Sequence, residues 1–224
     1  MIAVLYDIEG NLAALEAVLD DAISLGCDRF LIGGDNAGGP WPSETVALIR
    51  HLPGALYVRG NADRWLVDPP NEAEAPAHVR EMVEWTRASL SEEDVHWLGA
   101  LPDSVELDKV LFVHGSPLSD LQSFLPEPSP NDERLVAGTA ASTICFGHFH
   151  MQFVREGPSG KTLVNPGSVG LPWDGDPTAA WATYDGSFQL RRTAYDVRRA
   201  VETARRMPEP TSSSLARSYE TGRR

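Results

Sequence analysis

Short apolar runs alternate with amphipathic stretches over the first third of the chain. Residues 2–6, 29–32 and 55–58 are apolar runs of strand length, and leucines and alanines at helical spacing join the first run to the second. Asn11 stands where its side chain can cap this first helix, and Ser43 opens a second helix. The pattern predicts a strand–helix–strand–helix–strand unit, which is typical of a parallel α/β layer.

The rest of the chain changes from a helical to a strand-like pattern. Residues 71–101 have a helical pattern, and residues 196–206 form another expected helix, which two prolines end. Between these helices, strands are expected over residues 104–107, 110–113, 143–146, 152–155, 162–164, 179–184 and 188–192. Two strand-rich halves with helices at both ends predict an α/β fold in which two sheets pack face to face. We expect a single domain over residues 1–206 and a flexible tail rich in Ser and Arg over residues 207–224.

The charge of the chain is negative but unevenly distributed. The net charge of −13 combines −18 over residues 1–190 with +5 over residues 191–224. Because an acidic body repels a phosphate backbone, we expect no nucleic-acid partner. The basic end could dock on the body or on a neighbouring subunit, or it could remain solvated and partly disordered.

The sequence points to neither a membrane nor an oxidising compartment. It has no apolar run of about 18 residues, and no basic segment precedes the first strand, so we expect no membrane span and no signal peptide. Cys27 and Cys145 lie in apolar surroundings without metal-binding spacing, and we expect both to be buried free thiols. These features predict a cytoplasmic protein.

Side chains that can bind metals follow the apolar runs. These candidates are Asp7, Glu9, Asp35, Asn61, His114, His148 and His150. In an open α/β sheet, ligands bind at the carboxyl ends of the strands. Oxygen and imidazole groups without thiolates suit Mn, Fe, Zn or Mg. Each residue alone is a common turn or cap residue, so the inference depends on their joint order along the chain.

In this order, five segments resemble the motifs of the calcineurin-like metallophosphoesterase superfamily. The segments are DIEGN, GGDNAGGP, VRGNAD, FVHGSP and FGHFH, and the family pattern is D-x-H, G-D, G-N-[HCT], a later histidine and G-H-x-H. The likeness extends from Met1 to Tyr184 and is greatest to the small prokaryotic phosphodiesterase/phosphatase branch, which LVNPGSVGLPWDGDP also resembles. The family fold is a four-layer α/β/β/α sandwich, in agreement with the expected elements.

The resemblance implies two divalent metal ions, with Mn²⁺ expected and Fe, Mg, Ni, Zn or Co also compatible. One ion would be held by Asp7, Glu9, Asp35 and His150. The other would be held by Asp35, Asn61, His114 and His148, so that Asp35 bridges the pair. Two such ions lower the pKa of a bridging water, hold the phosphoryl oxygens and stabilise charge during in-line displacement.

The implied function is hydrolysis of phosphodiesters, and more weakly of monoesters, by a hydroxide that bridges the two metals. The residues that the resemblance makes catalytic are Asp7, Asp35, Asn61 and His148. Asn11 and Arg64 are the expected substrate-binding residues. The expected partner is a small-molecule phosphoester, and the family's habit suggests a homodimer.

Two positions depart from the family pattern. Glu9 replaces a histidine; its carboxylate could still bind a metal and would favour Mn²⁺ or Mg²⁺ over Zn²⁺. Alternatively, Glu9 turns away to cap the following helix, and that metal is weakly bound or missing. Ala62 stands where many members have a histidine that assists the leaving group, a contribution of about 10²–10⁴-fold in rate. We therefore expect slow hydrolysis of monoesters with poor leaving groups.

The departures also support a hypothesis from another class. The chain could be a catalytically weak or inactive metal-binding scaffold for protein–protein interaction, a use that some superfamily members make of this fold. Against this alternative, six of the seven expected ligand positions keep the family residue, and the seventh keeps a residue that binds metals. A phosphatase that acts on phosphoserine is disfavoured because the loops are short.

Overall fold

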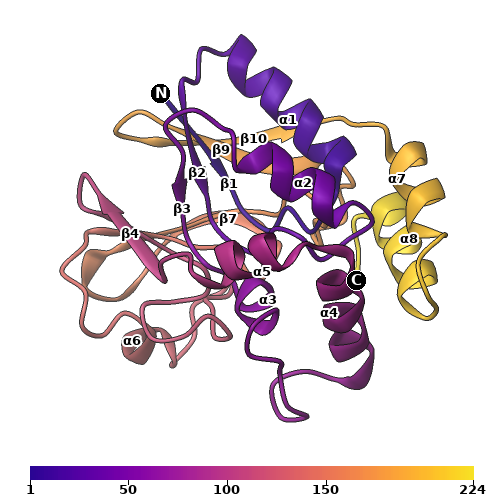
Figure 1. Ribbon diagram of the computed structural model, residues 1–224. Helices are drawn as coiled ribbons and strands as arrows, with labels where there is room; N and C mark the ends of the chain where they lie inside the picture. Colours follow the sequence, from indigo (N-terminus) through magenta and orange to yellow (C-terminus); the bar gives the residue numbers. More distant parts are fainter.

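The computed structural model describes residues 1–224 and contains two five-stranded mixed sheets that lie face to face (Figure 1). The first sheet consists of β1 (Ile2–Leu5), β2 (Arg29–Ile32), β3 (Leu56–Tyr57), β9 (Ala179–Tyr184) and β10 (Phe188–Thr193). The second sheet consists of β4 (Ser104–Leu107), β5 (Val110–Val113), β6 (Thr143–Cys145), β7 (Gln152–Glu156) and β8 (Thr162–Pro166). The strand order is β10-β9-β1-β2-β3 in the first sheet and β4-β5-β6-β8-β7 in the second.

Apolar side chains between the two sheets form the central core. Val4 and Leu31 of the first sheet pack with Phe112 and Val164 of the second. Cys145 lies in the same core, and both it and Cys27 are buried and free, as predicted. This core joins the sheets into one packed unit.

Helices cover the outer face of the first sheet. Helices α1 (Leu12–Ser24) and α2 (Pro42–Ile49) lie over it, with α7 (Val197–Ala204) and α8 (Thr211–Thr221) beyond the end of α1 (Figure 1). Leu15 and Val18 of α1 pack on Leu5, Ile32 and Trp181 of the sheet. None of the helices is both long and apolar enough to cross a membrane.

The second sheet has a thinner outer layer. Phe124 and Leu135 cover Ile144 and Phe146, and Leu135 belongs to the single-turn helix α6 (Asp132–Leu135). The remaining helical segments are α3 (Asn61–Trp65), α4 (Ala77–Ser89), α5 (Glu92–Gly99) and a 3₁₀ turn at Pro158–Gly160. The predicted α/β/β/α sandwich is therefore confirmed.

Parallel pairing brings several strand ends to one edge of the molecule. Strand β2 pairs in parallel with both β1 and β3, and β6 pairs in parallel with both β5 and β8. The carboxyl ends of β1, β2 and β3 therefore lie together, as do those of β5 and β6. The loops that follow these five strands build the site described below.

The course of the chain has two features that the sequence did not predict. Strands β9 and β10 belong to the first sheet, where β9 pairs antiparallel with β1 although about 180 residues separate them. The segment expected to be a flexible tail contains helix α8. Leu215, Ala216 and Tyr219 of this helix are buried against α7, and this burial stabilises a serine-rich segment that has little helix propensity of its own.

We predict that Leu215→Ala lowers the free energy of unfolding by about 2–5 kcal/mol, because it removes a buried side chain and leaves a cavity beside α7. Chemical denaturation measures the change. Arg217→Ala, an exposed position of the same helix, is the matched control and should change stability by less than about 0.5 kcal/mol. Equal stabilities for the two variants would mean that the C-terminal segment is not packed on the body.

Candidate metal centre

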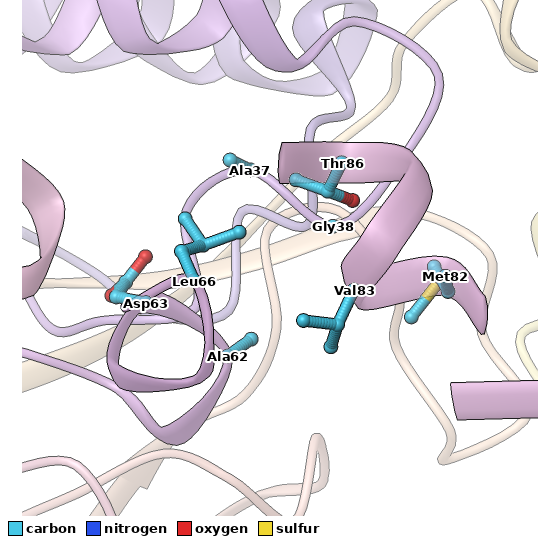
Figure 2. A pocket seen from close by; sticks show the side chains of 8 residues that line it. All are labelled: Ala37, Gly38, Ala62, Asp63, Leu66, Met82, Val83 and Thr86. Atoms are coloured by element: carbon cyan, nitrogen blue, oxygen red, sulfur yellow. The ribbon is translucent and has the colours of Figure 1, made fainter. Parts of the chain in front are cut away.

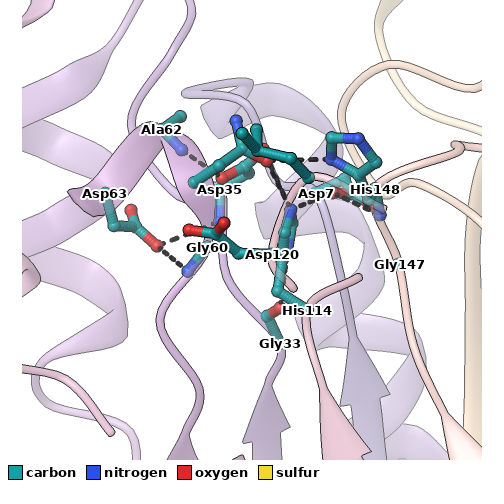
Figure 3. A network of polar contacts seen from close by, with 12 residues as sticks. Asp7, Gly33, Asp35, Gly60, Ala62, Asp63, His114, Asp120, Gly147 and His148 are labelled. Atoms are coloured by element: carbon teal, nitrogen blue, oxygen red, sulfur yellow. Dashed lines mark hydrogen bonds and ion pairs between the residues drawn. The ribbon is translucent and has the colours of Figure 1, made fainter. Parts of the chain in front are cut away.

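The carboxyl ends of five strands bring the seven predicted ligand residues into one buried region, part of which is shown in Figure 3. Asp7 and Glu9 follow β1, Asp35 follows β2, Asn61 follows β3, His114 follows β5, and His148 and His150 follow β6. Because the strands belong to both sheets, the region lies where the two sheets meet. Its side chains fall into two adjoining groups.

The first group consists of Asp35, Asn61, His114 and His148. Nε2 of His114 lies 3.2 Å from Oδ2 of Asp35 and 3.1 Å from Oδ1 of Asn61. Nδ1 of His148 lies 2.8 Å from the same Asn61 oxygen. One candidate ligand atom from each of Asp35, His114 and His148 lies within 4.8 Å of the others, a spacing that a single cation could span.

The second group consists of Asp7, Glu9 and His150. Nδ1 of His150 donates a hydrogen bond to the carbonyl of Leu171 at 2.7 Å, so the neutral ring presents the lone pair of Nε2 on its other side. That atom lies 3.6 Å from Oδ1 of Asp7 and 3.5 Å from Oε1 of Glu9. The His150 nitrogen and the two carboxylates are all electron-pair donors that face one another, an arrangement that fits a cation between them. A backbone carbonyl such as that of Leu171 commonly orients metal-binding histidines.

Glu9 therefore faces the site and does not cap the helix. The cap of α1 is Asn11, whose Oδ1 accepts a hydrogen bond from the amide of Ala14 at 3.2 Å. Nδ2 of Asn11 donates to the carbonyl of Gly170 at 3.0 Å, and the side chain is fully buried. Both polar ends of Asn11 are thus hydrogen-bonded within the fold, and its contact with substrate stays a prediction.

Five of the seven residues have positive φ angles, which are unusual for residues other than glycine. They are Asp7 (51°), Glu9 (51°), Asp35 (53°), His148 (67°) and His150 (54°). The left-handed conformation costs about 1–2 kcal/mol for each such residue. Strain of this kind persists where the surrounding structure enforces it, and it gathers at functional sites. Here the left-handed conformation turns side chains at several strand ends toward the same region.

Burial determines the protonation of the site. It raises the pKa of Asp7 to about 8 and that of Glu9 well above its usual range, and nearby carboxylates add to both effects. Burial also lowers the pKa of His148 to about 4 and that of His150 to about 3. Burial alone would lower the pKa of His114, but the Asp35 carboxylate outweighs it and raises the value to about 10. Without a cation, the cluster therefore retains protons that metal binding must displace.

Asp63 supports the candidate site and was not identified from the sequence. Its carboxylate accepts hydrogen bonds from the amides of Asp35 (3.0 Å), Asn36 (3.1 Å) and Gly60 (2.9 Å), so it ties the loop after β2 to the start of α3 (Figure 3). Burial raises its pKa to about 6. The signal was present in VRGNAD, where an acid three residues after Gly60 can accept from the Gly60 amide, as the second residue of a capping box does.

The loop after β8 supports the second group. The hydroxyl of Ser168 donates to the carbonyl of Asp7 at 2.7 Å and accepts from the amide of Leu171 at 2.7 Å. The ring of Trp173 stacks on that of His150, with centroids 4.1 Å apart. This loop therefore fixes the position of Asp7 and the orientation of His150.

Arg64 lies beside the site but is already paired. Its guanidinium donates to Asp120 at 2.6 Å and lies 3.5 Å from Glu74. It lines a polar cavity of about 400 Å³ that also reaches His114 and Ser119. Arg64 thus remains a candidate substrate contact through this cavity.

Comparison with known proteins shows the family. The model of the calcineurin-like phosphoesterase superfamily domain matches residues 1–187. The chain therefore belongs to the calcineurin-like phosphoesterase superfamily, as its motifs indicated. This family is metal-dependent, and membership supports a phosphoric ester hydrolase.

Individual relatives extend over nearly the whole chain. An uncharacterised protein of Methanocaldococcus jannaschii is 31% identical over 234 aligned positions, which cover 93% of this chain and 94% of the relative. The crystal structure of a metallophosphoesterase from Sphaerobacter thermophilus has a TM-score of 0.80 at 27% identity and covers 99% of this chain and 98% of its own. A hypothetical protein from Pyrococcus horikoshii OT3 has the same fold, with a TM-score of 0.82, 21% identity and coverage of 96% and 98%.

We predict that the metal-free protein loses stability as the pH rises from 6.5 to 8. In this range, folded Asp7 and His114 hold protons that the unfolded chain has released, because their folded pKa values of about 8 and about 10 exceed the ordinary 3.8 and 6.5. For each proton that only the folded protein retains, the free energy of unfolding falls by about 1.4 kcal/mol per pH unit. His148 and His150 have lowered values and oppose this trend at and below about pH 6.5, and their contribution fades as the pH rises to 8.

Urea unfolding at the two pH values, with chelator and with Mn²⁺, measures this effect. Because metals bind the deprotonated ligands, the stability of the Mn²⁺-loaded protein should instead rise with pH over the same range. Unchanged or greater stability at pH 8 in chelator would contradict the assigned protonation.

We also predict that Asp63→Asn weakens metal binding by about 10–100-fold although Asp63 is not a proposed ligand. The new amide places a donor among three backbone donors and releases the loop that carries Asp35. Titration with Mn²⁺ measures the affinity. Asp68→Asn, whose carboxylate is 82% exposed, is the control and should bind like wild type. Wild-type affinity in Asp63→Asn would show that the loop keeps its position without this carboxylate.

Proposed function

We propose that the protein is a dinuclear metal-dependent phosphoesterase that prefers phosphodiesters. The observation that carries the proposal is the pair of adjoining side-chain groups at the strand ends. Oδ1 of Asp7 in one group lies 3.9 Å from Nε2 of His114 in the other, and His114 in turn contacts Asp35. One ion would be held by Asp7, Glu9, Asp35 and His150, and the other by Asp35, Asn61, His114 and His148.

In this proposal, Asp35 is the residue shared by both metals. When bound, two divalent ions would lower the pKa of water and stabilise charge on the phosphoryl group. The protein's own residues hold and orient the proposed ligand carboxylates. The backbone amide of His148 donates to Asp7 at 3.0 Å, and that of Ala62 donates to Asp35 at 2.7 Å. Glu9 contributes a further oxygen, which favours Mn²⁺ over softer ions.

No side-chain nucleophile is needed for this reaction. The hydroxyl of Ser168 donates to the Asp7 carbonyl, and that of Ser116 donates to the carbonyl of Ser119 at 3.2 Å. Both cysteines are free thiols buried in apolar cores. Water is therefore the nucleophile that the proposal requires.

The preference for phosphodiesters follows from Ala62. Its methyl group faces a hollow of about 10 Å³ whose opposite wall is formed by Met82, Val83 and Thr86 of α4 (Figure 2). Position 62 therefore offers no proton to a leaving group, and α4 occupies the space that a larger side chain would need. Substrates with good leaving groups, such as aryl phosphodiesters, should be hydrolysed best. The polar cavity beside Arg64 would take the organic part of the substrate.

We predict that the Mn²⁺-loaded protein hydrolyses bis(para-nitrophenyl) phosphate faster than it hydrolyses the monoester phenyl phosphate. Asp35→Asn should lower the rate on the diester by about 10²-fold or more, because it removes the ligand shared by both ions. Release of para-nitrophenol and of phosphate measures the two reactions.

The control for this assay is Asp28→Asn, which changes an exposed aspartate paired with the N-terminus at the opposite end of β2 and should leave the rate unchanged. Metal binding without hydrolysis of either ester, in the presence of Mn²⁺, Ni²⁺, Co²⁺ or Mg²⁺, would instead favour the non-catalytic scaffold.

A further inference from the structure

A second cavity adjoins the candidate metal centre. Its volume is about 410 Å³, close to that of the polar cavity beside Arg64, and small-molecule pockets in proteins commonly have about 300–1,000 Å³. The polar cavity reaches His114 and the second cavity reaches His148, and these two rings have centroids 5.4 Å apart (Figure 3). The loop after β5 lies along both cavities, since residues 116–120 line the first and residues 121–123 line the second. The two cavities therefore approach the same part of the candidate centre.

The walls of the two cavities differ in chemistry. The polar cavity is lined mainly by arginine, aspartate and serine residues. The second cavity has four apolar residues in its wall, which are Leu121, Leu125, Leu135 and Phe149. Leu125 is 40% exposed, and apolar surface of this kind is stabilised when an apolar group covers it. The second cavity therefore favours an apolar group, and the first favours a polar one.

Phe149 lies between the two histidines of the FGHFH motif, and its ring takes no part in the apolar cores. Positive φ angles at His148 and His150 turn the chain on both sides of it. The ring lies outside every buried apolar cluster, whereas Phe146 and Phe153 pack against each other with centroids 5.8 Å apart. The half-buried Phe149 instead lines the second cavity. An aromatic side chain thus stands in this cavity beside a proposed metal ligand.

Hydrogen bonds hold the walls of the second cavity. Arg155 donates to the carbonyl of Leu125 at 2.8 Å and to the carboxylate of Asp132 at 2.7 Å, so it joins the loop after β5 to helix α6. The hydroxyl of Ser123 donates to the carbonyl of Gly147 at 3.2 Å and joins the same loop to the FGHFH motif. The cavity is therefore preformed, which reduces the entropy lost when a ligand binds.

We propose that the second cavity binds one arm of the phosphodiester substrate and that Phe149 selects an aromatic ring for this arm. A phosphodiester carries two organic groups on its phosphorus. A phosphoryl group held beside His114 and His148 has both cavities within reach, so each can take one arm. The inference rests on the proposed function and narrows its substrates to diesters that have one aromatic and one polar arm.

The pair of cavities also gives a reason in binding for the preference for diesters. A monoester has one organic group and leaves one of the two cavities without an occupant. The contacts of the second arm are therefore gained only with a diester. This reason is separate from the missing proton donor at Ala62, which concerns the leaving group.

A stacked ring sets the size of the expected effect. Aromatic pairs are attracted beyond the burial of their apolar area. Loss of a stacking side chain commonly weakens the binding of a planar group by about 5–150-fold. Leucine at position 149 would keep apolar area but offer no ring face, so we expect a loss of about 5–10-fold.

The test measures the binding of diphenyl phosphate and of diethyl phosphate to the Mn²⁺-loaded full-length protein. Bound Mn²⁺ speeds the relaxation of the phosphorus-31 signal, which gives a dissociation constant for each diester and also reveals hydrolysis. Both diesters have identical arms, so the orientation of the ligand does not affect the result. Wild type should bind diphenyl phosphate about tenfold more tightly than diethyl phosphate. Phe149→Leu should weaken diphenyl phosphate by about 5–10-fold and leave diethyl phosphate unchanged.

Two further variants separate stacking from structural damage. Phe149→Tyr keeps the ring and should bind both diesters like wild type. Phe188→Leu makes the same change as Phe149→Leu at another half-buried phenylalanine, on β10 of the first sheet, where it packs on Tyr184 with centroids 4.8 Å apart. This control should also bind both diesters like wild type. The affinity for Mn²⁺ should be the same in all three variants.

Four results would overturn the inference. They are equal affinity of wild type for the two diesters, wild-type affinity for diphenyl phosphate in Phe149→Leu, an equal loss for both diesters in that variant, and the same selective loss in Phe188→Leu. Because the readout is binding, a wild type that shows the expected pattern but hydrolyses no phosphoester would overturn only the proposed function. A wild type that binds neither diester beside Mn²⁺ would overturn both.

Discussion

The structure depends on the burial of several carboxylates and imidazoles at one edge of two sheets. Asp7, Glu9 and Asp35 lie close enough to repel one another, and burial makes their charged forms costly. The protons of Asp7 and Glu9, and the positive charge of His114, hold the cluster together when no cation is bound. A divalent ion at the proposed centre would replace those protons with a stronger charge. The repulsion among the carboxylates would then contribute to the affinity of the site for that ion.

The rest of the fold keeps these groups in place. Each parallel strand delivers one or two side chains to the edge, and positive φ angles turn them inward. Asp63 binds the backbone of two loops, while Ser168 and the Leu171 carbonyl fix Asp7 and His150 from the other sheet. Strained backbone and buried hydrogen bonds thus act together to position the same side chains. Neither would persist without the apolar core between the sheets.

The sequence predicted the features that depend on local spacing. The apolar runs and the polar residues after them located the strand ends, the fold class and all seven side chains now found together. Long-range pairing was beyond such reasoning, because nothing local shows that β9 lies beside β1. Helix α8 was missed because three apolar residues among serines form a helix only when α7 covers them. Asn11 shows that a residue in a functional motif can also serve the fold, since its side chain caps α1 and bonds the loop after β8.

The pairing of β1 with β9 has a consequence for biosynthesis. The first strand leaves the ribosome with an apolar edge whose partner is synthesised only after about four-fifths of the chain. The histidines that face Asp7 and Glu9 also arrive late, after β5 and β6. Until then the nascent polypeptide carries an unpaired strand edge and clustered acids without their counterparts, and both invite misassociation. The need for chaperones during translation should therefore depend on the number of residues that separate β1 from β9.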